Sequence, residues 1–190
     1  DRLPLNDSSL LGIYSSHCFE HLKTSRVSHW MKECYRVLQP GGILRVTLPN
    51  IEEFFDAYKS KNAAYFDWIR GKSTYQYDSW LRLIVRAFAE SVVDKYSDNE
   101  LYQLYNDLSR TEFLDFFDNK QERIEDPKLL WPHNHKSWWA PSKLITILKT
   151  SGFSEAKEVS ADETTCEMFK GGIFNKTHPE MSFFVEATKF

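Results

Sequence analysis

The sequence predicts an α/β fold built around a parallel β-sheet. Two short apolar runs, Leu11–Ser15 and Ile43–Leu48, flank a segment with the 3.6-residue period of an amphipathic helix, and Pro40-Gly41-Gly42 provides the turn into the second run. Strand, helix and strand in this order make a βαβ unit, whose two strands are parallel neighbours. Ligands of such sheets bind outside the carboxyl ends of the strands, so we expect a site after each run.

The segment between the two runs is predicted to form a helix with one face on the sheet. Thr24 or Ser25 is expected to cap its first turn, and Pro40 with Gly41 is expected to stop it. Its apolar positions recur at the spacing of a single helical face: Val27, Trp30, Met31, Cys34, Tyr35 and Leu38.

After the second run the chain enters a long segment, 51–140, where roughly 2–6 residues would be a usual connection. Four stretches in this segment have helical spacing, and their expected starts are Asn50 (with Glu53 completing a capping box), Ala63, Asp78 and Asp98. Leu114, Phe116 and Phe117 are expected to precede a charged loop, and 127–140 is expected to be extended and aromatic. The segment is interpreted as a helical insertion or lid over the site.

The end of the chain returns to strand and helix patterns. Pro141 predicts the first turn of a helix that ends at Gly152, and strands are expected at Phe153–Ser160 and Ser182–Thr188. The predicted organisation is an α/β domain made of residues 1–50 and 141–190, with the helical insertion at 51–140.

Composition excludes several classes of protein. The net charge is −3 and the lysines and arginines are scattered, so nucleic acid is not an expected partner. No apolar run approaches the roughly 20 residues that cross a bilayer, so no membrane association is expected. The three cysteines form no C-x-x-C pair, which suits reduced thiols in a cytoplasmic protein.

Several motifs resemble class I S-adenosylmethionine-dependent methyltransferases. They are Leu3-Pro4-Leu5, Ile13-Tyr14-Ser15-Ser16-His17, Glu20-His21-Leu22, Glu33-Cys34-Tyr35-Arg36-Val37-Leu38-Gln39-Pro40-Gly41-Gly42 and the closing Phe183-Phe184-Val185-Glu186-Ala187-Thr188-Lys189. The resemblance begins at the loop before the family's fourth strand. It implies the carboxyl-terminal portion of a Rossmann-like sheet, with strands in the order 4, 5, 7, 6 and the last strand antiparallel. The insertion remains unmatched.

The resemblance also implies S-adenosylmethionine as the cofactor and assigns residues to it. Leu3 and Pro4 would lie near its adenine side, and Ser15, Ser16 and His17 near its methionine and sulfonium end. Methyl transfer requires an acceptor held in line with the sulfonium, exclusion of water and in some cases a base. His17 is the candidate catalytic base, and a hydrogen bond at the rim of the site is the other interpretation of this residue.

The acceptor is expected to be a small molecule bound under the insertion. We place Asn50, His133, His135 and Trp138 at this acceptor and assign no metal ligand. The other interpretation is that the aromatic insertion packs only on itself or against another subunit.

Two parts of the family's cofactor site have no counterpart in these residues. They are the Gly-rich loop after the first strand and the acidic residue after the second strand. We therefore expect the 190-residue chain to hold the acceptor half of a site that residues before Asp1 complete, and to bind S-adenosylmethionine weakly or not at all. We also expect an unpaired edge on strand Leu11–Ser15, which favours aggregation or association into a homo-oligomer.

Two other functions stay open. His17-Cys18-Phe19-Glu20-His21 has the H-x-x-E-H pattern of a zinc hydrolase, which needs both histidines on one helix. We expect these histidines to lie on either side of a strand-to-helix turn, and Glu20 and His21 to make hydrogen bonds at the start of the helix. The third function is a non-catalytic, methyltransferase-like domain that binds a partner.

Overall fold

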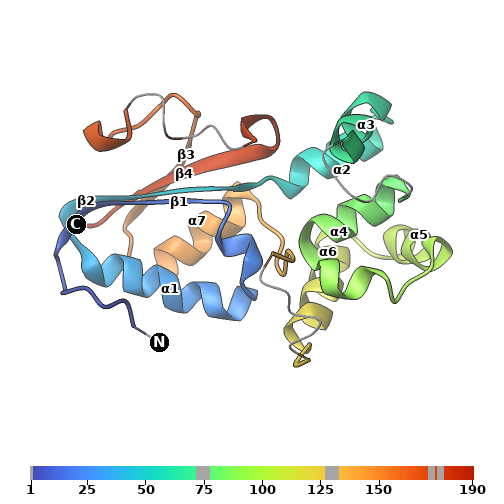
Figure 1. The fold of residues 1–190 in the computed structure, drawn as a ribbon, viewed down its shortest axis with the longest axis horizontal. Helices are drawn as coiled ribbons and strands as arrows, with labels where there is room; N and C mark the ends of the chain where they lie inside the picture. The colour runs from blue at the N-terminus through green and yellow to red at the C-terminus, as the bar shows by residue number, and fades with distance from the viewer. Residues whose placement is uncertain (1, 72–77, 127–132, 171–173, 175–177) are drawn as a thin grey trace. The chain divides into compact units, whose positions relative to one another are not determined.

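The chain divides into two units that are described separately. A computed structural model describes residues 2–71, 78–126, 133–170, 174 and 178–190 (Figure 1). The first unit comprises Asp1–Asn50 and Trp139–Phe190, and the second comprises Ile51–Trp138. Residues 127–132 of the predicted aromatic stretch lie outside the described residues, and so does the pair Gly171-Gly172 of the loop expected between the last two strands. No described helix has the length and apolar character needed to span a membrane.

The first unit contains a four-stranded mixed sheet in the order β1-β2-β4-β3. Its strands are β1 (Leu10–Ser16), β2 (Leu38–Pro49), β3 (Glu155–Val159) and β4 (Ser182–Thr188). Strands β1 and β2 are parallel, and β4 lies antiparallel to both β2 and β3. This confirms the predicted order 4, 5, 7, 6 with an antiparallel last strand, and it places β1 at an edge of the sheet.

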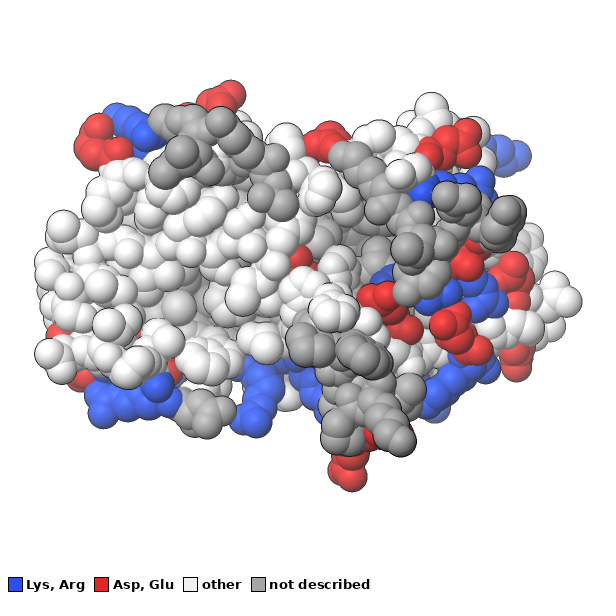
Figure 2. Space-filling model, in the orientation of Figure 1, with Lys and Arg blue, Asp and Glu red and all other residues white. Residues whose placement is uncertain are grey.

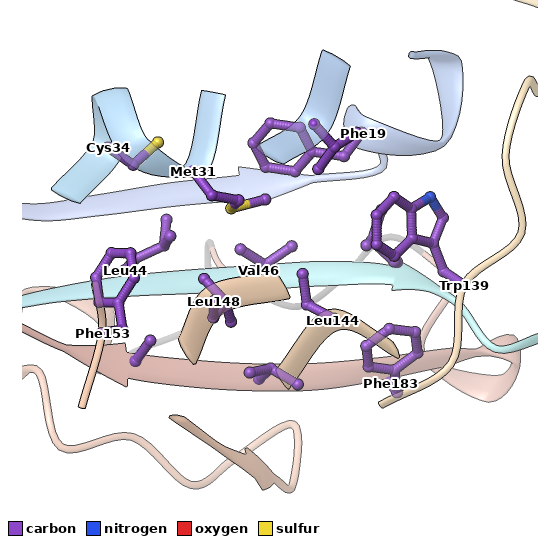
Figure 3. Close-up of a cluster of buried hydrophobic side chains, with 14 of the residues drawn as sticks. Phe19, Met31, Cys34, Leu44, Val46, Trp139, Leu144, Leu148, Phe153 and Phe183 are labelled. Atoms are coloured by element: carbon purple, nitrogen blue, oxygen red, sulfur yellow. The ribbon is translucent and has the colours of Figure 1, made fainter. Parts of the chain in front are cut away.

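Helices α1 (Thr24–Val37) and α7 (Pro141–Thr150) cover one face of this sheet (Figure 1). Apolar residues of β2 and β4 meet these helices in the core that Figure 3 shows, which includes Met31, Leu44, Val46, Leu148 and Phe153. The prediction that Thr24 or Ser25 caps α1 is wrong. Lys23 occupies the cap position, and its side chain makes no capping hydrogen bond to the helix. Thr24 Oγ1 instead accepts a hydrogen bond from Lys143 Nζ at 3.2 Å.

Strand β2 begins earlier than predicted, because the Pro40-Gly41-Gly42 turn lies inside it. Gly41 has a φ of +79°, and its N–H donates to Lys189 O at 2.7 Å. The ladder with β1 shifts register here, from Leu10 opposite Leu38 to Gly12 opposite Ile43. A left-handed glycine thus absorbs a bulge within the strand instead of ending the preceding helix.

The described part of the segment that connects β3 to β4 packs on the opposite face of the sheet. Its short helix η2 (Glu167–Phe169) packs on Gly12, where an added Cβ would lie 2.8 Å from Met168 Cε. The same face buries Arg45, whose side chain alternates with those of the core residues on β2.

The second unit is helical. Its helices are α2 (Ile51–Lys59), α3 (Ala63–Gly71), α4 (Trp80–Val93), α5 (Asp98–Asp107) and α6 (Arg110–Glu122). Ser79, and not the predicted Asp78, caps α4, because the Asp78 carboxylate accepts a hydrogen bond from Arg86 at 2.7 Å. Helix α6 replaces the predicted approach to a charged loop, and it begins with a capping box between Ser109 and Glu112.

In Figure 2 a broad area of the first unit is uncharged, and side chains of both signs lie next to one another over the second unit. In α4, Arg86 pairs with Asp78 and Asp94, and Arg82 pairs with Asp98 at 2.8 Å. The two arginines of α4 are thus paired with acidic residues that lie outside the helix.

Candidate functional site

His17 lies at the carboxyl edge of the sheet, directly after β1. Its backbone has a φ of +47°, a left-handed conformation that costs a non-glycine residue about 1–2 kcal/mol. Its N–H donates to Thr47 O at 3.0 Å, which ties the turn to the neighbouring strand. Strained residues of this kind concentrate at functional sites.

Both nitrogens of the His17 ring face polar side chains. Nε2 lies 2.9 Å from Ser182 Oγ, at the start of β4, and Nδ1 lies 3.1 Å from Glu20 Oε1. The Glu20 side chain is only 1% exposed, and the His17 side chain is 14% exposed. The ring of His178 meets the His17 ring edge to face at 5.8 Å between centroids. The arrangement connects a hydroxyl, an imidazole and a buried carboxylate.

Ser16 and Thr47 are cross-strand partners at the same edge. Both hydroxyl oxygens are buried, and neither has a hydrogen-bond partner within the described parts of the chain. A buried hydroxyl without a partner costs about 1–3 kcal/mol, so these two oxygens fit the edge of a polar ligand. Ser15 lies on the opposite face of β1 and interacts with Cys18, whose thiol pKa is raised by burial.

Leu3 and Pro4 lie at the other end of β1. Leu3 N–H donates to Glu33 Oε2 at 2.9 Å, and Arg36 donates to Leu3 O at 3.1 Å, which holds this loop beside the last turns of α1. Leu10, at the start of β1, pairs with Leu38. The structure therefore does not bring Leu3 and Pro4 together with Ser15, Ser16 and His17, and their contact with a cofactor stays a prediction.

Asn50 lies at the carboxyl edge beside His17's partner Ser182. Its N–H donates to Met181 O at 2.8 Å, and Ser182 pairs with Pro49. Asn50 is thus the one predicted acceptor residue in the first unit.

The other predicted acceptor residues, His133, His135 and Trp138, belong to the second unit. His135 is held against a kink of α4 at Ala89, where φ is −137° and ψ is 46°. Beside the kink, Glu90 N–H donates to His135 O at 3.2 Å, and His135 Nδ1 lies 2.7 Å from Ala87 O. This contact favours the Nδ1–H tautomer, with a lone pair on Nε2. The acceptor role of the three residues stays a prediction.

The zinc-hydrolase interpretation lacks the helix it needs. His17 precedes the short helix η1 (Phe19–His21), and His21 ends it. The two histidines lie on either side of a strand-to-helix turn, as predicted. His17 also has a protein partner at each ring nitrogen.

Glu20 and Ser182 join the site although they were not predicted site residues. Glu20 follows His17 by three residues, and the H-x-x-E-H pattern is the sequence signal that places these two residues close together. Ser182 is 165 positions from His17, and the signal for it is the predicted sheet order. An antiparallel last strand beside β2 must begin at the carboxyl edge, where the site lies.

The amino-terminal part of the chain, which includes β1 and His17, matches a known protein family. Residues 1–46 match the family model described as "Methyltransferase domain". A search of curated proteins found no match.

Three solved structures resemble the chain. A SAM-dependent methyltransferase from Archaeoglobus fulgidus has 16% identity and a TM-score of 0.41, over 97% of this chain and 62% of that one. A SAM-dependent methyltransferase from Thermotoga maritima has 13% identity and a TM-score of 0.41, over 100% and 60%. A possible exported protein from Bordetella parapertussis has 12% identity and a TM-score of 0.42, over 97% and 40%. The chain thus spans 40% to 62% of the length of these three structures.

Proposed function

We propose that the protein is an S-adenosylmethionine-dependent methyltransferase that acts on a small molecule. The observation that carries this proposal is the match of residues 1–46 to the methyltransferase domain model, which includes β1 and His17. The sheet order β1-β2-β4-β3 supports it, because that order is the one expected from the resemblance. The buried hydroxyls of Ser16 and Thr47 fit one wall of a cofactor site.

In this proposal the residues of the carboxyl edge bind and orient the reactants. The cofactor, when bound, supplies an electrophilic methyl group on a sulfonium. Ser16 lines its methionine end, and Asn50 lies where the acceptor would enter from the end of β2. His17 holds the proton that a hydroxyl or amine acceptor releases. Methyl transfer also requires that water be excluded from the acceptor.

Binding of S-adenosylhomocysteine to the full-length gene product tests the proposal. Isothermal titration calorimetry should show micromolar binding. Ser16→Ala should weaken binding by about 2- to 10-fold, the effect of one lost hydrogen bond. Ser142→Ala changes an exposed serine on α7 and should leave it unchanged. Absence of binding by the full-length product would overturn the proposal and favour a non-catalytic partner-binding domain.

A further inference from the structure

The geometry points to a proton relay in which Ser182 passes a proton to His17 and Glu20 is the positioning residue of the His17 ring. This inference rests on the proposed function and adds two residues to it. It is carried by the juxtaposition of three side chains from β4, the turn after β1, and η1. The atoms concerned are Ser182 Oγ, the two ring nitrogens of His17, and the Glu20 carboxylate.

The first step of the argument concerns the Glu20 carboxylate. Its side chain is 1% exposed, and neither oxygen makes a well-formed hydrogen bond to any described residue. A buried carboxylate is costly unless a positive or proton-bearing group lies beside it. His17 Nδ1 at 3.1 Å is the nearer such group, and His21 Nε2 at 3.9 Å is the farther one. Glu20 therefore favours a proton on His17 Nδ1, which leaves the lone pair on Nε2.

The second step concerns the proton of the Ser182 hydroxyl. Ser182 Oγ lies 2.9 Å from His17 Nε2 and 2.7 Å from His178 O, and both of these atoms can accept its single proton. When His17 is neutral, the hydroxyl donates to Nε2. When Nε2 carries a proton, Nε2 donates to Ser182 Oγ and the hydroxyl turns to His178 O. The hydroxyl thus has a partner in both protonation states of His17.

The third step concerns access to His17. Because Ser182 Oγ occupies the Nε2 side of the ring, an acceptor meets the serine hydroxyl before the imidazole. The acceptor's proton moves to Ser182 Oγ while the hydroxyl proton moves to Nε2, so that one proton enters and one leaves the serine. The electron pair of the broken acceptor bond stays on the acceptor for the new bond to carbon. Glu20 offsets the charge that His17 gains, as the carboxylate of a hydrolytic triad does.

Nitrogen-15 NMR of the histidine rings in the full-length gene product tests the role of Glu20 without any acceptor. His17 should be the Nδ1–H tautomer in the wild type, and Glu20→Gln should shift it toward the Nε2–H tautomer. Glu158→Gln, on the exposed side of β3, should leave the ring signals unchanged. An Nε2–H tautomer in the wild type overturns the inference, and so does a tautomer that Glu20→Gln leaves unaltered.

Diethyl pyrocarbonate, which modifies unprotonated histidine nitrogens, tests the role of Ser182. Ser182→Ala uncovers Nε2, so the rate of His17 modification, followed by mass spectrometry, should rise several-fold. Ser142→Ala should not change that rate. An unchanged rate in Ser182→Ala means that the serine does not cover Nε2, and it overturns the relay. Neither the NMR experiment nor the modification experiment requires cofactor binding. Failure to bind S-adenosylhomocysteine would therefore contradict the proposed function and would not by itself contradict the roles of Ser182 and Glu20.

Discussion

Two buried polar side chains of β2, Arg45 and Thr47, face the same side of the sheet and differ completely in their partners. Both are 0% exposed, and they are two residues apart. The Arg45 guanidinium donates to Glu186 Oε1 at 2.8 Å and to three backbone carbonyl oxygens at 2.7, 3.0 and 3.2 Å. Thr47 Oγ1 has no partner among the residues that the structure describes.

The difference follows position along the strand. Arg45 lies inside the sheet, where it ties the β3–β4 connection to β2. Thr47 lies toward the carboxyl edge, opposite Ser16, where a bound ligand would complete its hydrogen bonding. Near the amino edge of the sheet, Arg36 is paired as Arg45 is. It forms ion pairs with Glu33 at 2.8 Å and with Asp7 at 2.7 Å. Arg45 and Arg36, which connect separate segments of the first unit, are paired, whereas the Thr47 and Ser16 hydroxyls at the carboxyl edge have no partner among the described residues.

The largest expected effect comes from breaking the buried ion pair between Arg45 and Glu186. Glu186→Gln removes the charge beside buried Arg45, and it should lower the free energy of unfolding by about 3–5 kcal/mol. Thr165, which donates to Glu186 Oε2 at 3.0 Å, is uncharged and cannot replace a counter-ion. Urea denaturation measures the change, with the exposed Glu158→Gln as the control. Equal midpoints for the two variants would show that the pair does not stabilise the fold.

A smaller effect is expected from the pH dependence of the amino edge. Hydrogen bonds from Arg36, with one from Leu3 N–H, lower the pKa of Glu33 to about 2 from its ordinary 4.5. A lowered pKa in the folded state stabilises the protein above pH 4.5, and this stabilisation is lost as the pH falls toward 2. Urea midpoints measured across this range should therefore decline with acid.

The substitution Glu33→Gln isolates the contribution of Glu33 to the pH dependence of stability from the contributions of other carboxylates. The variant should be less stable than the wild type at pH 7, and the gap between them should narrow as the pH falls from 4.5 toward 2. A gap that stays constant with pH would assign the stabilisation to packing instead of charge.

The apolar spacing of the sequence was sufficient to predict most of the fold. Strand β4 has the predicted bounds, and Leu144 and Leu148 of α7 are buried in the core. Helix α6 was missed because Asp115, Asp118 and Lys120 interrupt its apolar positions, although Ser109-x-x-Glu112 is a local start signal.

The site was harder to predict than the fold because its contacts are not local. Ser16 and His17 follow an apolar run, so their position at the strand end was predictable. The contact between His17 and Ser182 depends on which strands become neighbours, and the left-handed backbone of His17 depends on its hydrogen bond to Thr47 O. The spacing of apolar residues around His17 predicts neither the contact with Ser182 nor the left-handed backbone.

The smallest expected effect concerns the buried Thr47 hydroxyl. The same substitution, threonine to valine, is made at Thr47 and at Thr165. Thr47→Val removes a buried hydroxyl that has no partner in the described structure, so it should be neutral or stabilising by up to about 1 kcal/mol. Thr165→Val removes a hydroxyl that donates to Glu186, so it should be destabilising by about 1 kcal/mol. Urea midpoints measured without ligand compare the two variants. If Thr47→Val destabilises the protein as much as Thr165→Val does, then the Thr47 hydroxyl already has a partner and the carboxyl edge is not prepared for a polar ligand.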